Sequence, residues 1–221
     1  CEGISLNNSI MQGPDLLSPM LGIILRFRQK CVAVTADIES FFHRVRVPEE
    51  DFDFTRYLWF ENDDPYGDVI ELRMRCHLFG GISSQCCAVY AVWKTVDGAV
   101  HDGWISQEEA LKILRDLYSD DLLRSYDAVP EAIDSSLLFK KILAESKFNL
   151  TKFTSSHSQV LDAIPGEGHQ KMEKDLRLDD APKSALGLHW IVGTDRLTFG
   201  KFPDERAVIF TKRGLVSCIM T

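Results

Sequence analysis

The sequence lacks several features that would place a protein in a class at once. Its longest apolar run, from Met20 to Leu25, is far shorter than the roughly 20 residues of a membrane-spanning helix, so we expect no membrane as a partner. It has no internal repeat and no low-complexity tract. It also has no basic excess, because 33 acidic and 25 basic residues give a net charge of −8. Nucleic-acid binding would therefore depend on local basic patches, on bound metal or on parts of a longer protein.

Zinc-binding patterns are absent as well. None of the six cysteines forms a Cys-x-x-Cys pair, and no histidine follows one at zinc-finger spacing. The adjacent Cys86 and Cys87 lie in an apolar, helix-like segment, which indicates small buried thiols. A reducing, intracellular compartment is the simplest interpretation, and the sequence does not distinguish a cytoplasmic particle from the nucleus.

The sequence does contain the material of a folded domain. Hydrophobic residues make up 45% of the 221 positions, and 13 Phe, 5 Tyr and 4 Trp supply surface to bury, which excludes disorder as the main state. The length suits one sizeable domain or two small ones. The first residue is not Met and residues 217–221 continue an apolar pattern, so we expect a fragment of a longer protein.

Helical and extended patterns are interleaved along the chain. Helical spacing and end signals predict helices over residues 15–30, 83–96 and 130–146. A capping box at residues 106–109 predicts the start of another helix, and a last helix is predicted from Phe210. Short β-branched or alternating runs predict strands over residues 31–36, 148–153, 185–192 and 196–202, and hairpins over 56–75 and 117–123. Because strands, hairpins and helices are mixed in this order, the sequence favours an α+β fold over a doubly wound one.

One pair of aspartates stands apart from its surroundings. The Asp-Asp pairs at 63–64 and 179–180 lie in polar, proline-containing loops typical of solvated turns, but Asp120 and Asp121 have apolar residues on both sides. Adjacent carboxylates in a half-buried hairpin repel each other and lose hydration. A nearby cation would offset both costs, and Mg²⁺ prefers oxygen ligands of this kind.

Asp37 leads to the same chemistry independently. It follows a buried strand, and no basic residue is among its immediate neighbours. Taken singly, Asp37 is typical of a turn or a helix cap, and the Asp120–Asp121 pair fits a turn as well as a ligand set. Taken together, they could hold two Mg²⁺ or Mn²⁺ ions, which clamp the attacking and leaving oxygens of a phosphoryl transfer. Their separation along the chain does not decide between these alternatives.

Three ordered strings resemble the motifs of reverse transcriptases. Residues 35–43 resemble motif A, residues 78–84 resemble motif B, and residues 118–121 resemble the Tyr-x-Asp-Asp box, motif C. Further strings narrow the resemblance to the Bel/Pao group of LTR retrotransposons. They lie at residues 5–7, 12–17, 25–28, 45–50, 77–80, 150–152, 185–187 and 211–214. The ordered set covers essentially the whole chain.

This resemblance implies a right-hand polymerase palm with partial fingers and the start of the thumb. The implied activity is that of an RNA-directed DNA polymerase, which extends a primer on an RNA or DNA template with dNTPs. Other segments of the Pol polyprotein, namely fingers, RNase H and integrase, would be partners. The implied divisions are palm over residues 1–46, partial fingers over 47–80, palm again over 81–202 with a primer-gripping hairpin from 185, and the start of the thumb over 203–221.

The resemblance also implies a metal site. Asp37 and Asp120 would be the principal ligands of two Mg²⁺ ions, and Mn²⁺ is a possible substitute. The backbone carbonyl of Ile38 would join them, and Asp121 would complete the acidic cluster. These groups would activate the primer 3′-hydroxyl and stabilise the pyrophosphate leaving group.

Nucleotide contacts are implied in the same way. Phe42 falls where the family places an aromatic ring that excludes a ribose 2′-OH, although a core Phe, as expected for Phe41, is the alternative. Phe79 and Gly80 would line the nucleotide pocket, although a glycine alone indicates only a turn. Lys152 would lie near the incoming nucleotide, or be a solvated surface lysine. Six arginines could contact template phosphates or be surface charges: Arg26, Arg28, Arg44, Arg46, Arg73 and Arg75. Two histidines, His43 and His77, are better interpreted as structural.

The sequence departs from the family pattern in places. Ser119 replaces the Val, Met or Ala expected in the Asp-Asp box, and Gln85 stands where motif B commonly has Pro, so the start of that helix is expected to shift. The basic fingers strand that the family has upstream of Cys1 is not in the sequence. A second hypothesis therefore stays open, namely an inactive or domesticated retroelement remnant that acts as a binding module. A third, an unrelated acidic interaction module, requires every motif match to be accidental.

Overall fold

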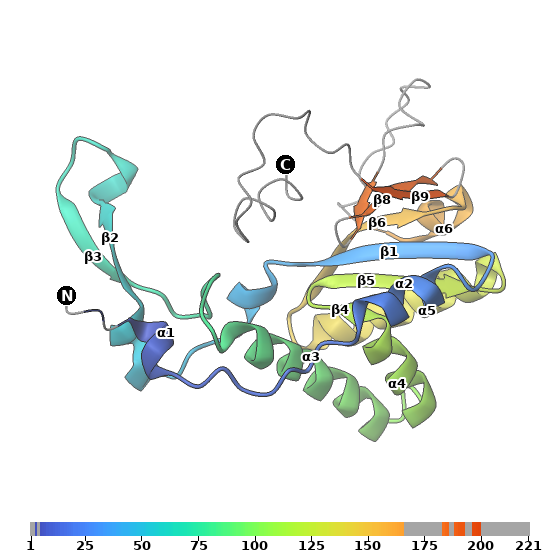
Figure 1. The fold of residues 1–221 in the computed structure, drawn as a ribbon, viewed down its shortest axis with the longest axis horizontal. Helices are drawn as coiled ribbons and strands as arrows, with labels where there is room; N and C mark the ends of the chain where they lie inside the picture. The colour runs from blue at the N-terminus through green and yellow to red at the C-terminus, as the bar shows by residue number, and fades with distance from the viewer. Residues whose placement is uncertain (1–2, 4, 166–182, 186–187, 193–195, 200–221) are drawn as a thin grey trace.

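The protein combines helices with three antiparallel sheets, as the α+β pattern predicts. The computed structural model describes residue 3 and residues 5–165, 183–185, 188–192 and 196–199. Its centre is a four-stranded sheet in the order β4-β5-β1-β6, with helices packed against it (Figure 1). Several predicted features lie outside the described residues: the helix from Phe210, the thumb at 203–221, the string at 211–214, residues 186–187 of the 185–187 string and residues 200–202 of the strand predicted over 196–202.

The elements follow one another in a mixed order. The α-helices are α1 (Leu6–Ser9), α2 (Met20–Phe27), α3 (Ser84–His101), α4 (Gln107–Arg115), α5 (Val129–Glu145) and α6 (Ser158–Ala163). The strands are β1 (Val32–Glu39), β2 (Arg56–Phe60), β3 (Val69–Arg73), β4 (Leu117–Tyr118), β5 (Asp121–Tyr126), β6 (Asn149–Ser155), β7 (Lys183–Ala185), β8 (Leu188–Ile191) and β9 (Arg196–Phe199). Short 3₁₀ helices are η1 (Phe41–Arg44), η2 (Glu49–Thr55) and η3 (Glu61–Asp63).

Most of the elements expected within the described residues are present. The strand predicted at 31–36 is β1, the hairpin predicted over 56–75 is β2–β3, and the hairpin predicted over 117–123 is β4–β5. Ser106 is the N-cap of α4, and its hydroxyl accepts a 3.1 Å hydrogen bond from the Glu109 backbone N–H, which is one half of the predicted capping box. The Glu109 carboxylate contacts Arg124 at 2.6 Å.

Two predicted elements differ in extent. The helix predicted over 15–30 begins only at Met20, because Pro19 has extended backbone and disfavours helix in the residue before it. Leu16 and Leu17 pack against the core from outside the helix instead. The strand predicted over 185–192 is divided between two antiparallel strands, β7 and β8.

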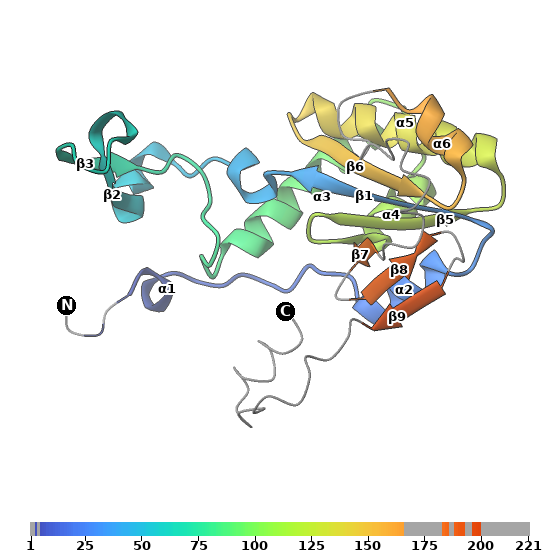
Figure 2. The same cartoon turned by 90° about the horizontal axis from the view of Figure 1, so that it is seen from above.

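Alternation along β1 gives the central sheet two different faces. Even-numbered residues of β1 face the main core with α3 and α5: Val32, Val34, Ala36 and Ile38. On the other face, Ala33 and Leu123 pack with α2 and with Trp190 of β8. Figure 2 shows α5 and α6 on one side of the sheet and α2 with β7–β9 on the other. By the same alternation, Asp37 belongs to the face that carries α2 and β8.

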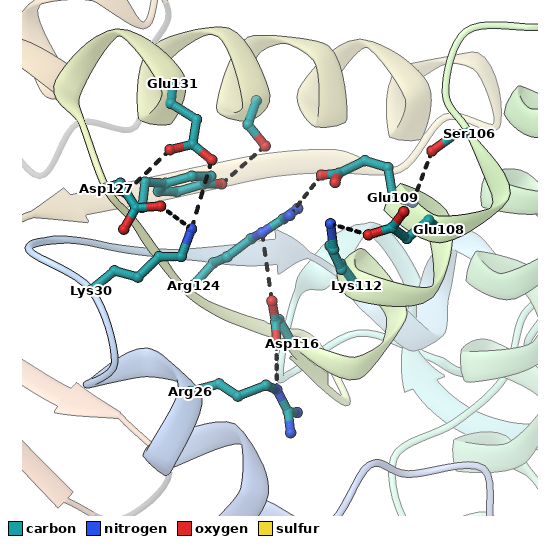
Figure 3. A network of polar contacts seen from close by, with 12 residues as sticks. Arg26, Lys30, Ser106, Glu108, Glu109, Lys112, Asp116, Arg124, Asp127 and Glu131 are labelled. Carbon is teal, nitrogen blue, oxygen red and sulfur yellow. Dashed lines mark hydrogen bonds and ion pairs between the residues drawn. The ribbon is translucent and has the colours of Figure 1, made fainter.

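A buried ion-pair network joins the sheet to the helices around its β4–β5 end (Figure 3). Arg124 of β5 contacts Glu109 of α4 at 2.6 Å and Asp116 at 3.5 Å, and Asp116 receives a 2.8 Å hydrogen bond from Arg26 of α2. Asp116 is 6% exposed and Arg124 is 9% exposed. Burial raises the pKa of Asp116, whereas Arg26 and Arg124 oppose that rise. The network therefore fixes α2 and α4 to the hairpin.

One part of the fold, the β2–β3 hairpin, does not pack closely against the rest. The β2–β3 hairpin stands away from the central sheet (Figures 1 and 2), and every residue of β2 is exposed.

Cys86 and Cys87 of α3 are half-buried, so the prediction of buried thiols is wrong. The buried positions of α3 are Ser84, Ala88, Val89, Val92, Val96 and Ala99, and the two cysteines lie beside this face of the helix. Burial and the neighbouring Cys86 raise the pKa of the Cys87 thiol.

Candidate active site

Strand register brings the separate acidic positions of the sequence together. β1 and β5 are antiparallel neighbours, and Asp37 lies directly opposite Asp121. The backbone N–H of Ile38 donates a 2.8 Å hydrogen bond to the carbonyl of Asp120. Residues opposite each other on antiparallel strands project from the same face, so Asp37 and Asp121 share one end and one face of the sheet.

A tight hairpin presents Asp120 and Asp121. Tyr118 pairs with Asp121, which leaves Ser119 and Asp120 as the connection between β4 and β5. Ser119 has a φ of 58°, in the left-handed region that such two-residue connections commonly use. Asp120 and Asp121 are both half-buried, as the sequence predicts for this pair.

The three carboxylates of Asp37, Asp120 and Asp121 carry more negative charge than the neighbouring Lys152 neutralises. The pKa of Asp121 is raised from its ordinary value of 3.8 to about 6, first by burial and then by the charges of Asp120 and Asp37. Lys152 acts in the opposite direction. The carboxylates are therefore close enough to repel one another, and the cluster would be stabilised by additional positive charge.

Lys152 is the basic partner of this cluster. Its Nζ lies 3.1 Å from Oδ1 of Asp37, with the lysine side chain 60% exposed and the aspartate side chain 25% exposed. The β1–β6 register shifts between Thr35 and Asp37, and Lys152 in this irregular stretch has a φ of 52°. A bulge of this kind redirects a side chain. Asp37 thus has a basic neighbour in space, although it has none in the adjacent sequence.

The donor set suits a hard cation that is shared with a substrate. Across the described residues, no three His, Cys, Asp or Glu side chains lie close enough together to hold a metal ion by themselves. Mg²⁺ in phosphoryl-transfer sites commonly takes one or two protein carboxylates and completes its shell with water and substrate phosphates. Asp37, Asp120 and Asp121 are half-buried carboxylates at one end of the sheet and could serve as protein ligands of that kind.

An aromatic group follows the acidic end of β1. Phe41 is 2% exposed and belongs to the core, as predicted, whereas Phe42 is half-buried at the edge of that core. The two residues lie in the 3₁₀ helix η1, which turns their side chains in different directions. The ring of Phe79 is 70% exposed and lies edge-on to Phe42, with 4.9 Å between centroids, and 5.5 Å from the ring of His43.

Gly80 lies in the turn that follows Phe79. Its φ is 84°, and a Cβ on it would meet no atom within 4 Å. The backbone conformation, and not crowding, therefore accounts for glycine at this position. The structure thus brings Phe42 and Phe79 into contact, with Gly80 adjacent to them in the chain.

Several other expected residues have identifiable neighbours. Three of the six arginines contact carboxylates within the protein: Arg26 contacts Asp116, Arg44 contacts Glu39, and Arg73 contacts Asp53. His77 Nδ1 lies 3.4 Å from the Ser84 hydroxyl, and burial lowers the pKa of His77. That environment agrees with a structural His77.

Sequence reasoning missed two polar links at this site. The two positions that depart from the family pattern meet, because the Ser119 hydroxyl lies 3.4 Å from Oε1 of Gln85. Gln85 stands in the first turn of α3, and its buried Nε2 has no hydrogen-bond partner among the described residues. Asn7 binds the backbone of the turn at Gly80 and Ile82. The only sequence signal was that Ser119 and Asn7 lie in strings that resemble the family and that Gln85 directly follows one.

Comparisons with known proteins add no assignment. No protein-family model matches the chain, and no curated protein matches it. Of the helices in the described part, none combines the length and the apolar character that crossing a membrane requires.

Proposed function

We propose that this chain is the catalytic palm of an RNA-directed DNA polymerase of the Bel/Pao retrotransposon type, which adds dNTPs to a primer on an RNA or DNA template. The observation that carries the proposal is the pairing of Asp37 with Asp121 beside Asp120. These residues come from two of the three ordered motifs and meet at one end of the central sheet. The motif B turn supplies Phe79, which contacts Phe42.

In the proposed reaction each residue has a definite task. Asp37 and Asp120 would hold the cations, the Ile38 carbonyl would be a third oxygen ligand, and Asp121 would add negative charge to the cluster. Two bound Mg²⁺ ions would supply charge neutralisation for the attacking 3′-oxygen and the departing pyrophosphate. Lys152, which contacts Asp37 and has a side chain that is 60% exposed, would supply a positive charge for the nucleotide phosphates.

The base and sugar of the nucleotide would rest on the aromatic side of the site. Phe42 is half-buried and packs on Phe41 at 5.3 Å between centroids, and its ring would reject a ribose 2′-OH by collision. Phe79 and Gly80 would border the pocket from the opposite segment. The site thus divides into a charged half for phosphates and an aromatic half for the nucleoside.

The direct test is thermal unfolding with and without Mg²⁺ or Mn²⁺. A cation that binds only the folded chain at about 100 times its Kd stabilises it by roughly 2.7 kcal/mol, so we expect a rise in Tm of several degrees. Asp37→Asn and Asp120→Asn should abolish that rise, whereas Asp134→Asn, an exposed position on α5, should preserve it. Variants at Asp37 and Asp120 that respond to cations as the wild type does would refute the metal site.

A binding module without catalysis is the second candidate. The exposed β2–β3 hairpin favours it, because Leu58 is 68% exposed, Trp59 is 50% exposed and Phe60 is 39% exposed. Large exposed apolar surfaces commonly mark interaction sites. A folded chain that shows no cation-dependent stabilisation at any concentration would favour this candidate over the polymerase.

A further inference from the structure

Asn7 uses both ends of its side-chain amide to hold a distant turn. Its Nδ2 donates a 2.8 Å hydrogen bond to the carbonyl of Gly80, and its Oδ1 accepts a 2.9 Å hydrogen bond from the backbone N–H of Ile82. These partners lie 73 and 75 residues further along the chain. A side-chain amide that binds one acceptor and one donor of the same backbone segment fixes both the distance and the orientation of that segment.

Other contacts also hold this turn: the Ser84 N–H donates a 3.1 Å hydrogen bond to the Gly81 carbonyl, and the Phe79 ring lies against the rings of Phe42 and His43. Within it, the Gly81 N–H reaches the Leu78 carbonyl at 3.3 Å, which is a long hydrogen bond. Phe79 and Gly80 are exposed, and Gly80 has the left-handed backbone that costs a glycine least. Without Asn7, the Gly80 carbonyl and the Ile82 N–H would turn to water. The two bonds from Asn7 are therefore the ones that fix the Gly80 carbonyl and the Ile82 N–H, next to the residue whose ring lies against Phe42.

The segment that carries Asn7 is itself anchored. α1 has no buried residue, so it cannot hold its own position. Farther along, Gly13 has a φ of 80° and lies so close to α3 that a Cβ would come within 2.7 Å of the Cys86 sulfur. Leu16 and Leu17 then pack against the core. Residues 10–19 thus form a strap fixed against α3, and Asn7 extends from its free end to the turn.

We propose that Asn7 is a positioning residue of the nucleotide pocket, which holds the turn at Gly80 and Ile82 so that Phe79 faces Phe42. This inference rests on the proposed polymerase function, because the pocket is that of the incoming dNTP. Asn7 touches neither the acidic cluster nor the aromatic rings in the structure. Its effect is therefore on the placement of the nucleoside and not on the chemistry at the phosphates.

Three variants separate the two bonds. Asn7→Ala removes both. Asn7→Asp keeps the acceptor for the Ile82 N–H but cannot donate to the Gly80 carbonyl. Asn8→Ala is the matched control, because Asn8 is the next residue of α1, is exposed, and its side chain makes no hydrogen bond to any described residue.

The first measurement is hydrogen exchange at the Ile82 amide, followed by NMR on the full chain without ligands. A hydrogen bond contributes about 1 kcal/mol, so we expect Asn7→Ala to speed exchange roughly 5-fold. Asn7→Asp should retain most of the protection, and Asn8→Ala should match the wild type. Exchange at Ile82 that is unchanged in Asn7→Ala would overturn the inference, whatever the polymerase activity.

The second measurement is steady-state incorporation of dTTP on an oligo(dT)–poly(rA) primer–template. We expect Asn7→Ala to raise KM for dTTP about 5-fold with kcat within twofold, in line with one lost hydrogen bond. Asn7→Asp should fall between it and the wild type, and Asn8→Ala should leave both constants unchanged. A faster Ile82 exchange with an unchanged KM would overturn the role in the pocket alone. A wild-type chain that neither binds nor incorporates dTTP would overturn the proposed function and, with it, this role.

Discussion

The ammonium group of Lys152 lies 3.1 Å from Oδ1 of Asp37, although 115 residues separate the two along the chain. A bulge in β6 delivers the lysine, and the antiparallel pairing of β1 with β5 and β6 delivers the aspartate. The contact places one positive charge against a group of three carboxylates. In the absence of cations Lys152 is therefore a competitor for the same carboxylate that the proposed metal site needs.

Replacing Lys152 should strengthen cation binding by the free protein. Lys152→Met removes a charge near Asp37, and two charges about 4 Å apart in water interact by roughly 1 kcal/mol, which corresponds to about 5-fold in affinity. We expect the Mn²⁺ concentration that gives half of the maximal Tm rise to fall by about that factor. Lys112→Met, at an exposed pair on α4, is the control. A higher midpoint for Lys152→Met would mean that the lysine does not compete with the cation.

This contact also marks what local sequence patterns can predict. The apolar run of β1, the hairpin over 117–123 and the strand that became β6 are each encoded by neighbouring residues. Their register is not, because it is set by packing between segments distant in the chain. The carboxylate chemistry suggested that Asp37 and the Asp120–Asp121 pair act together, and the family resemblance implied it, but the register that sets Asp37 opposite Asp121 is seen only in the fold.

The sequence-based errors have local physical causes. The helical spacing of Leu16 and Leu17 predicted a helix that Pro19 interrupts, so those leucines reach the core from an irregular strap. Asn7 and Ser119 gave no signal of their contacts, since short polar residues are equally common in solvated turns. Hydrogen bonds between residues so far apart in the sequence can be identified only from the folded structure.

The raised pKa of Asp121 predicts that its ionisation destabilises the cation-free protein. The folded chain holds the proton up to about pH 6, whereas the unfolded chain releases it near 3.8, so the folded state binds more protons between these values. Stability contributed by this group should therefore fall as pH rises from about 4 to 6 and stay low at pH 7.

Asp121→Asn should remove this penalty. We expect its unfolding free energy at pH 7 in EDTA to exceed that of the wild type, by on the order of 2 kcal/mol, and its stability to vary less between pH 4 and 6. Urea unfolding at several pH values is the measurement, with Asp134→Asn on α5 as the control. A destabilised Asp121→Asn at pH 7 would show that the carboxylate is compensated in the folded chain.

The buried network around Asp116 should be important for stability and not for cation binding. Asp116→Ala leaves Arg124, which is 9% exposed, without one of its carboxylates, and breaking a buried pair costs about 3–5 kcal/mol. Urea unfolding measures the loss. Glu108→Gln, in the exposed pair with Lys112, should have little effect.

A double variant tests the reason for that loss. If the cost comes from a charge left without its partner, Asp116→Leu with Arg124→Met should be less destabilising than the sum of the two single changes. Additive single and double effects would instead indicate that each side chain contributes through packing alone. In either case the cation-dependent rise in Tm should persist in every variant that folds.

Phe42 provides the sharpest test of the aromatic half of the site. Phe42→Ala removes the ring that lies against Phe79 and, in the proposed reaction, the collision with a ribose 2′-OH. We expect the ratio of kcat/KM for dTTP to that for UTP to fall by at least about 10-fold, which corresponds to roughly 1.4 kcal/mol of discrimination. Phe54→Ala, at a position 65% exposed in η2, should leave the ratio unchanged. Because Phe42 borders the core, both variants are compared by Tm first. An unchanged ratio in an active, folded Phe42→Ala would assign Phe42 to packing and leave sugar selection to another residue.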